Sequence, residues 1–313
     1  MAIELPDLLK YRAHFQSAGC TYPLQAVPFT AGGLLQELPE PADTKKTGWP
    51  WTEEVKPEAY AKTTSWPKLT IVTPSYNQVA FIETTIRAVL LQNYPNLEYI
   101  IIDGGSTDGS VEIINKYAPW ISFWESKTDN GQGHAINKGF SLASGKYYAW
   151  INSDDYYLPE TVLKVVELFR RSGVAFIYGY ALNWVADQNA FAAPAKMAPF
   201  ADIFIRMPSL AQPACFWSSA IHQPIWEDLH CSLDYELWLR LVKGQKRMRI
   251  REPLAVAAVH EHAKTFDPKM KEKWEADHQL ICSPDAHGPV TNWDKLMILY
   301  RIRNKIYNWL GWV

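Results

Sequence analysis

Two stretches decide the fold: residues 97–110, LEYIIIDGGSTDGS, and residues 147–155, YYAWINSDD. Each opens with a β-forming run almost without charge, which is typical of a strand buried on both faces of a parallel sheet. Asp103 ends the first run, and Asp154 and Asp155 follow the second. Ligands of open α/β sheets bind outside the carboxyl ends of such strands, so these carboxylates are predicted to frame one crevice. It would suit ribose or base hydroxyls and a hard divalent cation.

The sequence around these two stretches alternates between strand and helix patterns. Strands are predicted over 69–73, 97–103, 121–126 and 146–152, and helices over about 110–117 and 132–143, with others following residues 81 and 159. This alternation predicts the α/β class, a mostly parallel sheet with helices on both faces. Beyond Gly173 the alternation loosens, with strands expected over 175–180 and 212–217 and a helix over 232–242.

Four regions follow from this pattern. The chain is divided into an N-terminal extension without assignable chemistry, a nucleotide-binding half, an acceptor-binding and catalytic half, and a C-terminal amphipathic tail, at residues 1–66, 67–172, 173–280 and 281–313. The extension is rich in Pro and Gly and reads as a connector.

Composition excludes several classes of protein. With 313 residues, 48% of them hydrophobic, the chain can bury a sizeable core. A net charge of −2 gives no general attraction to nucleic acid. Four widely separated cysteines form no CxxC pair, so reduced thiols are expected. Since neither a signal peptide nor a long apolar span is seen, a cytoplasmic location is expected.

The ordered motifs carry a family resemblance. TIVTPSYNQVAFIETTIRAVLLQNYPNLEYIIIDGGSTDGS (70–110), followed by DNGQGHAINKGFSLASGKYYAWINSDD (129–155), resembles a family 2 glycosyltransferase with the GT-A fold. The resemblance covers about residues 69–160 strongly and 212–265 more weakly, through QPACFW, SLDYELWLRL and HEHAKT. It implies an inverting, metal-dependent transferase that uses a nucleoside diphosphate sugar.

The resemblance also implies the donor and metal residues. Those expected at the donor are Thr73, Pro74, Ser75, Tyr76, Asp103, Asp129, Lys138 and Asp154. Asp103 would accept a hydrogen bond from the imide N–H of uracil or thymine, favouring a UDP or dTDP donor; alternatively, it only caps the following glycine turn. Asp155 and His260 are the expected ligands of Mn2+ or Mg2+, with His262 the alternative to His260. Asn152 departs from the family pattern, which often has Asp there.

The catalytic base implied by the resemblance is Asp234, at the start of a predicted helix, with Glu236 as the rival. A carboxylate beside the acceptor hydroxyl takes its proton as the new bond forms, and the first helical turn favours the ionised form. Gln212, Pro213 and Trp238 are candidates for the acceptor pocket, although Trp238 is also a core candidate.

The predicted activity is sugar transfer to a glycan or a lipid-linked saccharide. The alternative is a nucleotide-sugar or glycan binding protein without turnover, which would need Asp103, Asp154 and Asp155 but not Asp234. A nicotinamide dehydrogenase is disfavoured, because no GxGxxG follows the first strand.

The C-terminal tail forms an apolar stripe when written as a helix. The stripe consists of Ile298, Leu299, Ile302, Ile306, Trp309 and Leu310, with Arg303 and Lys305 beside it and Trp312 near the end. This pattern predicts either a helix at the inner face of the membrane or one that docks on the protein itself or on a second subunit.

Overall fold

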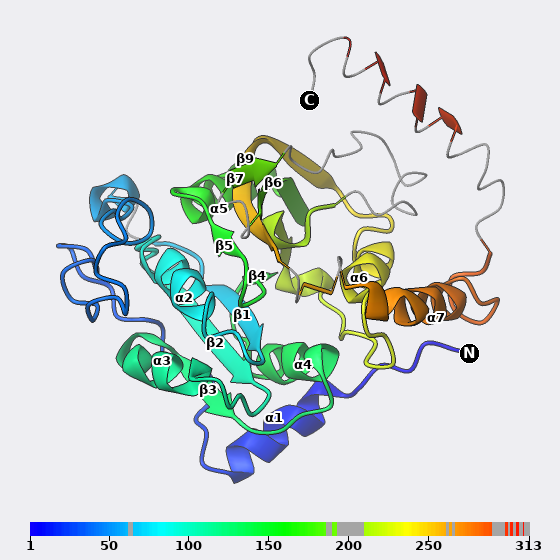
Figure 1. Ribbon diagram of the computed structural model, residues 1–313, viewed down its shortest axis with the longest axis horizontal. Coiled ribbons are helices and arrows are strands. Elements are labelled where there is room, and N and C mark those ends of the chain that lie inside the picture. The colour runs from blue at the N-terminus through cyan, green and yellow to red at the C-terminus, as the bar shows by residue number, and fades with distance from the viewer. Residues whose placement is uncertain are drawn as a thin grey trace.

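The structure, a computed structural model, describes residues 1–61, 65–185, 190–192, 210–260, 263–264 and 267–289, with seven further positions between 298 and 309. Figure 1 shows a central twisted sheet with helices packed on both of its faces. The predicted α/β class is confirmed. No helix among the described residues is both long enough and apolar enough to cross a bilayer.

The described strands form a single sheet. They are β1 (Leu69–Ser75), β2 (Leu97–Asp103), β3 (Phe123–Ser126), β4 (Tyr147–Trp150), β5 (Tyr156–Tyr157), β6 (Phe176–Val185), β7 (Ala190–Ala192), β8 (Cys215–Ser218) and β9 (Arg247–Val259). Their order is β3-β2-β1-β4-β8-β6-β9-β5, and β7 pairs with β6. The first four strands pair in parallel, whereas β8 joins β4 antiparallel. The sheet therefore runs without a break through both predicted halves.

Seven α-helices are described. They are α1 (Leu8–Ser17), α2 (Ile82–Leu90), α3 (Ser110–Lys116), α4 (Gln132–Leu142), α5 (Thr161–Ser172), α6 (Leu233–Leu241) and α7 (Lys271–Ile281). Short 3-10 turns cover Pro57–Tyr60, Ala118–Trp120, Gln212–Ala214, Ser219–Ile221 and Pro268–Met270. All of these turns except Gln212–Ala214 lie outside the predicted elements, as do α1, α7, β5, β7 and β9.

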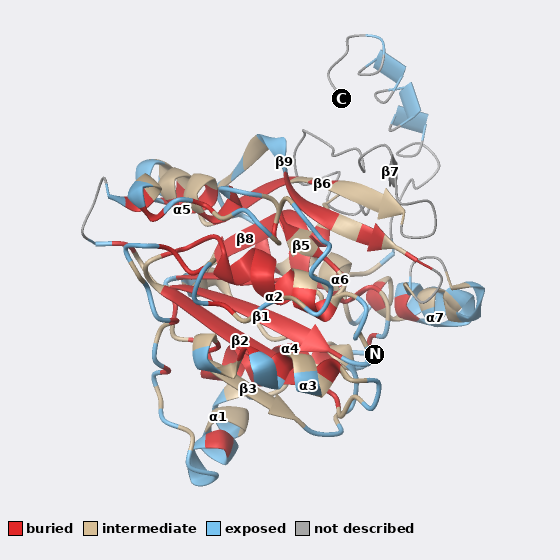
Figure 2. Ribbon diagram, turned by 60° about the vertical axis from the view of Figure 1, so that its left-hand side comes forward, coloured by how far each residue is buried: buried red, intermediate tan, exposed pale blue. Residues whose placement is uncertain are grey.

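Two hydrophobic cores lie on opposite faces of the sheet. One core contains residues of α2, α3 and α5 and the other contains residues of α1, α4, α6 and α7. Strand β1 supplies both, since Ile71 joins the first core and Val72 the second. Such alternation explains why β1 and β2 are buried along their whole length, because both faces are covered (Figure 2). Gly139 lets α4 lie directly on β1, since a Cβ there would overlap Val72.

The N-terminal segment contributes to these cores, which its connector-like composition did not indicate. Phe15 of α1 is buried in the core beside α4, and Val27 donates a backbone hydrogen bond to Leu97 of β2. Arg87 of α2, buried, donates to the carbonyls of Pro39, Pro50 and Trp51. Residues 1–61 thus wrap the sheet and tie down α2, the helix that follows the first strand tip.

Candidate active site

The candidate site lies at the carboxyl edge of β1, β2 and β4. These strands are neighbours and parallel, with Ser75 opposite Asp103 and Val72 opposite Trp150. Their tips therefore open on one side of the sheet, and the segments 73–76, 103–106 and 152–155 meet there. This is the edge of the sheet at which the acidic strand ends were predicted to meet.

The tip of β1 is mostly enclosed. Thr73, Pro74 and Ser75 are buried, and the Thr73 hydroxyl lies 3.2 Å from the Tyr99 hydroxyl. Tyr76, by contrast, is 62% exposed. Within the described residues, the buried Ser75 Oγ has no hydrogen-bond partner. Of the four residues predicted here, Tyr76 offers a surface to a ligand and Ser75 offers an unsatisfied hydroxyl.

Asp103 is fully buried, and its carboxylate holds the glycine turn. Its Oδ2 accepts from the backbone N–H of Gly105 and Ser106 and from the Ser126 hydroxyl, and Oδ1 accepts from the Ser106 hydroxyl at 2.5 Å. Gly105 has φ +85°, in the left-handed region that favours glycine. The alternative considered for Asp103, turn capping, is therefore present in the structure.

Tyr76 and Asp129 flank Gly104. A Cβ built on Gly104 would lie 3.3 Å from both Asp129 Oδ2 and Tyr76 Cδ2, so the missing side chain lets them approach. Lys138, predicted beside the donor, is nearly buried and forms an ion pair with Glu125, with the Phe15 ring nearby. Its ammonium is engaged within the protein, because α4 turns this position toward β3 and α1.

Asp154 and His260 meet at the mouth of the crevice. The His260 Nε2 lies 3.2 Å from Asp154 Oδ2, and the imidazole stacks on Phe81 with ring centroids 4.5 Å apart. Asp155 is turned inward, where its Oδ1 accepts from the backbone N–H of Ala258 at 3.1 Å. Burial, with the adjacent Asp154 charge, raises the pKa of Asp155 well above its usual value. Asp154 thus takes the position next to His260 that was expected for Asp155; His262 lies outside the described residues.

Asn152 joins several polar side chains. Its Oδ1 accepts from Gln132 Nε2 and Trp150 Nε1, and its Nδ2 donates to Gln212 Oε1 at 3.2 Å and, at 3.4 Å, to Asp155 Oδ2. An aspartate could not donate these last two bonds. Asn152, where the family pattern often has Asp, therefore supplies a neutral donor between two acceptor oxygens, those of Gln212 and Asp155.

Asp234 and Glu236 differ in their surroundings. Glu236 is fully buried and binds Arg240 through two contacts of 2.7 Å and His287 at 2.9 Å. Burial opposes its ionisation, but these bonds outweigh burial and lower its pKa. Asp234, half-buried in the first turn of α6, has a pKa raised to about 6 by burial, which exceeds the effect of its backbone hydrogen bonds. Above about pH 6, Asp234 is therefore ionised, and it is the less buried of the two carboxylates.

The comparisons with known proteins agree with this geometry. Residues 70–200 match Glycosyl transferase family 2. Over these residues the chain is similar to members of that family. The chain is 36% identical over 124 residues to TuaG of Bacillus subtilis (strain 168), which is named as a teichuronic acid biosynthesis glycosyltransferase; the match covers 38% of this chain and 49% of TuaG. The chain thus spans about half the length of that relative.

A longer match extends this similarity into the second half of the chain. WcaA of Escherichia coli (strain K12), named for colanic acid biosynthesis, is 23% identical over 256 residues, covering 78% of this chain and 91% of WcaA. Among solved structures, S. aureus TarS 1–349 in complex with UDP-GlcNAc has a TM-score of 0.54 at 18% identity, covering 70% of this chain and 69% of that one. These similarities show the GT-A fold.

The residues predicted to bind the acceptor lie inside the glycosyltransferase fold. Gln212 is 8% exposed and donates to the Trp150 carbonyl at 2.8 Å, Pro213 is buried, and Trp238 is 2% exposed against Trp150 and Trp217. All three side chains are buried in this arrangement, and their contact with an acceptor stays a prediction. Gln212 instead positions Asn152, and Trp238 belongs to the core, the alternative considered for it.

Asp277, near the site, was not predicted, whereas Lys264 lies in HEHAKT, a segment that carries the family resemblance, and was considered as a phosphate contact. Asp277 of α7 is 1% exposed, and its carboxylate accepts from the backbone N–H groups of His230, Cys231 and Ser232 at 2.7–3.1 Å. It thereby holds the turn that leads into Asp234. Lys264 Nζ donates to Gln132 Oε1 at 2.8 Å and to the His230 carbonyl at 3.0 Å. Both act across long sequence separations, which a local pattern cannot reveal.

Proposed function

We propose that this protein transfers a sugar, with inversion, from a nucleoside diphosphate sugar to a hydroxyl of a glycan or lipid-linked saccharide in polysaccharide or glycoconjugate biosynthesis. The observation that carries the proposal is the meeting of Asp154 and His260, 3.2 Å apart, beside the strand tips of a GT-A sheet. Relatives named for teichuronic and colanic acid biosynthesis support the polymer context, and the TarS structure with UDP-GlcNAc supports a nucleotide sugar.

The donor nucleoside would lie between Tyr76 and Asp129, above Gly104. Tyr76 offers an exposed ring for the base, and the Ser75 hydroxyl offers an unsatisfied polar atom at the strand tip. Asp103 would read the imide of uracil or thymine, with Ser106 releasing Oδ1 for that bond. Thr73 and Pro74 would shape the pocket from beneath, and Lys138 would act through its ion pair with Glu125.

The polar groups around Asp154 fit a divalent metal ion. The Asp154 carboxylate and the His260 imidazole face one another there. The neighbouring Asp155 is a second acid, and the charge of Asp154 disfavours its ionisation. No three His, Cys, Asp or Glu side chains gather as a metal site in the described part of the chain. Mg2+ and its relatives are often held by one or two protein ligands with substrate phosphates supplying others, so Asp154 and His260 would hold Mn2+ or Mg2+ together with the diphosphate. Such an ion neutralises charge on the leaving diphosphate.

In the transfer step, Asp234 would take the proton of the acceptor hydroxyl. The acceptor oxygen forms its bond to the anomeric carbon while the bond to the diphosphate oxygen breaks, and the nucleoside diphosphate leaves with that electron pair. Attack from the face opposite the leaving group inverts the anomeric centre. The raised pKa of Asp234 brings its basicity closer to neutral pH, where general bases are most effective.

A ligand screen tests the proposed function. Thermal unfolding would be followed with UDP-, dTDP- and GDP-sugars, each with Mn2+, Mg2+ or EDTA, and a donor at 100 times its Kd should add about 2.7 kcal/mol to the free energy of unfolding. Slow release of nucleoside diphosphate from the stabilising donor would then reveal turnover. Stabilisation without any release or transfer would favour a binding protein, and stabilisation by no donor would refute the proposal.

The C-terminal tail would bring the enzyme to a membrane surface. Ile298, Leu299, Ile302 and Ile306 are 47–55% exposed and Trp309 is 85% exposed, all at helical positions. Arg301 and Lys305 lie among them, also exposed, whereas Arg303, Leu310 and Trp312 lie outside the described residues. An apolar stripe with basic neighbours suits an anionic lipid surface, and with it a lipid-linked acceptor.

We expect the full chain to float with liposomes containing anionic lipid, and a chain ending at residue 291 to remain at the bottom of the gradient. A full-length variant with Ile302→Asp and Ile306→Asp is the matched control, because it keeps the length and changes only the stripe. Equal flotation of all three proteins would reject the membrane role and favour docking on protein.

A further inference from the structure

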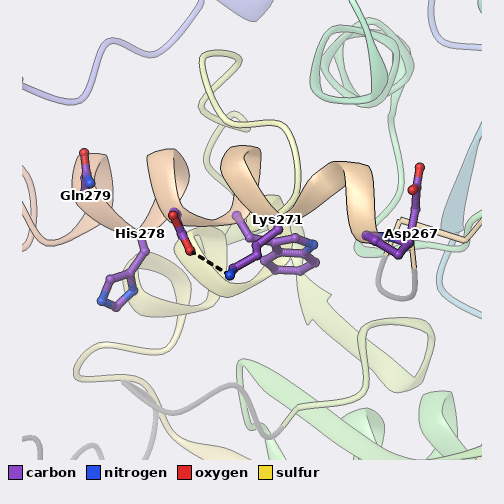
Figure 3. A pocket seen from close by; sticks show the side chains of 7 residues that line it. Asp267, Lys271, His278 and Gln279 are labelled. Atoms are coloured by element: carbon purple, nitrogen blue, oxygen red, sulfur yellow. Dashed lines mark ion pairs between the residues drawn. The ribbon is translucent and has the colours of Figure 1, made fainter.

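An open groove runs along one side of α7, outside the strand-tip crevice. Its volume is about 750 Å3, and it is lined by Asp267, Pro268, Lys271, Trp274, Glu275, His278 and Gln279. Figure 3 shows Lys271 and His278 projecting from the same side of the helix, with Lys271 near Glu275. Among the described residues that line it, all are polar except Trp274 and Pro268.

The groove is connected to the active site at two points. Trp274 Nε1 donates to the Lys264 carbonyl at 3.3 Å, and the Lys264 ammonium reaches Gln132 at the crevice. One turn away on the same helix, Asp277 holds the backbone of residues 230–232, directly before Asp234. Helix α7 is thus fixed to the segment that carries His260 and to the helix that carries the base.

We infer that this α7 groove binds the sugar chain of the acceptor, with Trp274 as its stacking platform. The inference rests on the proposed transferase function and specifies where its acceptor lies. An indole face packs against the apolar C–H face of a pyranose ring, while carboxylate, amide and imidazole groups exchange hydrogen bonds with its hydroxyls. Since Gln212, Pro213 and Trp238 are buried, the groove supplies the exposed acceptor surface that those residues do not.

The chemistry of the lining favours a carbohydrate over a protein segment. Lys271, Glu275 and His278 are exposed and charged or titratable, and within the described lining only Trp274 provides a large apolar side chain. An amphipathic helix would need several apolar contacts along such a groove. A polyhydroxylated chain needs one aromatic face and many polar partners, which is what α7 presents.

A glycan array of bacterial oligosaccharides, probed with the full chain in UDP and Mn2+, tests the inference. The wild-type protein should retain at least one oligosaccharide, and Trp274→Ala should bind it about tenfold more weakly. Trp274→Phe should stay within about threefold, because it keeps an aromatic face and loses only the N–H bond to Lys264. Glu272→Ala, on an exposed position of α7 outside the groove, should bind as the wild type does.

UDP affinity, measured by calorimetry on the same proteins, separates the inference from the proposed function. Unchanged UDP binding with lost glycan binding in Trp274→Ala supports the α7 groove. Glycan binding that survives Trp274→Ala, loss in Trp274→Phe equal to that in Trp274→Ala, or a wild-type protein that retains no oligosaccharide would overturn it. Failure of the wild type to bind any nucleoside diphosphate would instead count against the transferase function itself.

Discussion

Replacement of Asp234 by Asn is expected to lower the rate of sugar transfer by about 10²–10⁴-fold, the usual contribution of a positioned general base. Donor affinity should change less than about twofold, because α6 contributes the base rather than a strand tip. Transfer would be measured with the donor identified by thermal unfolding, and donor affinity by calorimetry. Full transfer by Asp234→Asn would remove Asp234 from its assigned role.

The pH dependence gives a second readout of the same residue. A base works when deprotonated, so the raised pKa of Asp234 predicts that kcat/KM rises through about pH 6 and levels off above it. The midpoint of this rise should lie above the ordinary pKa range of carboxylates, since burial disfavours the charged form of Asp234. The neighbouring Cys215 thiol is itself buried and neutral. In Asp234→Asn this limb should be absent from the residual rate.

Glu236→Gln is the matched comparison two residues along the helix. The substitution removes the negative charge that pairs with the Arg240 guanidinium, and it weakens the contact with His287. The melting temperature should therefore fall. The rate per folded molecule and the limb near pH 6 should persist. Loss of the limb in Glu236→Gln, with its retention in Asp234→Asn, would exchange the two roles.

The strands and helices of the first half were predictable because their sequences repeat a local rule. Strand β2 is apolar from residue 99 to residue 102, and α2 places Ile82, Ile86 and Val89 on one face; such patterns are decided within ten residues of chain. Strand β9 was missed although it ends in the apolar run LAVAAV, because its first part, RMRIREP, is charged and only partly buried. Its place in the sheet depends on pairing with β6, which lies far away in the sequence.

The candidate site likewise combines features that local sequence determines with features that distant contacts determine. The strand-tip positions of Asp103 and Asp154 follow from where an apolar run stops, and the sequence therefore located them. Which of Asp154 and Asp155 faces His260 depends on β9, because the Ala258 backbone binds Asp155 and draws it inward. Burial of Trp238 likewise results from Trp150 and Trp217 on other strands. Side-chain direction at a strand end is a tertiary property, so the local pattern located the acidic residues but did not determine which of them faces His260.

Asp154→Asn is therefore expected to remove the metal dependence of donor binding. In the wild type, Mn2+ should tighten UDP affinity; in Asp154→Asn, affinity with Mn2+ should equal affinity in EDTA, and kcat/KM should fall about 10²–10³-fold, because charge on the leaving diphosphate is no longer stabilised. His260→Ala should reproduce the change in part, since its imidazole faces the same carboxylate. Calorimetric titration of UDP with and without Mn2+ measures the difference directly.

Asp155→Asn is the control that decides between neighbouring carboxylates. The Asp155 side chain accepts from the Ala258 N–H, and burial favours its neutral form, so an amide keeps the shape and the oxygen that faces Ala258 and gives up only the 3.4 Å bond from Asn152. The variant should therefore fold with near wild-type stability and retain Mn2+-dependent UDP binding within about tenfold. If Asp155→Asn abolishes that dependence while Asp154→Asn preserves it, Asp155 is the ligand, as the family resemblance implied, and the inward direction seen here must reverse when the donor binds.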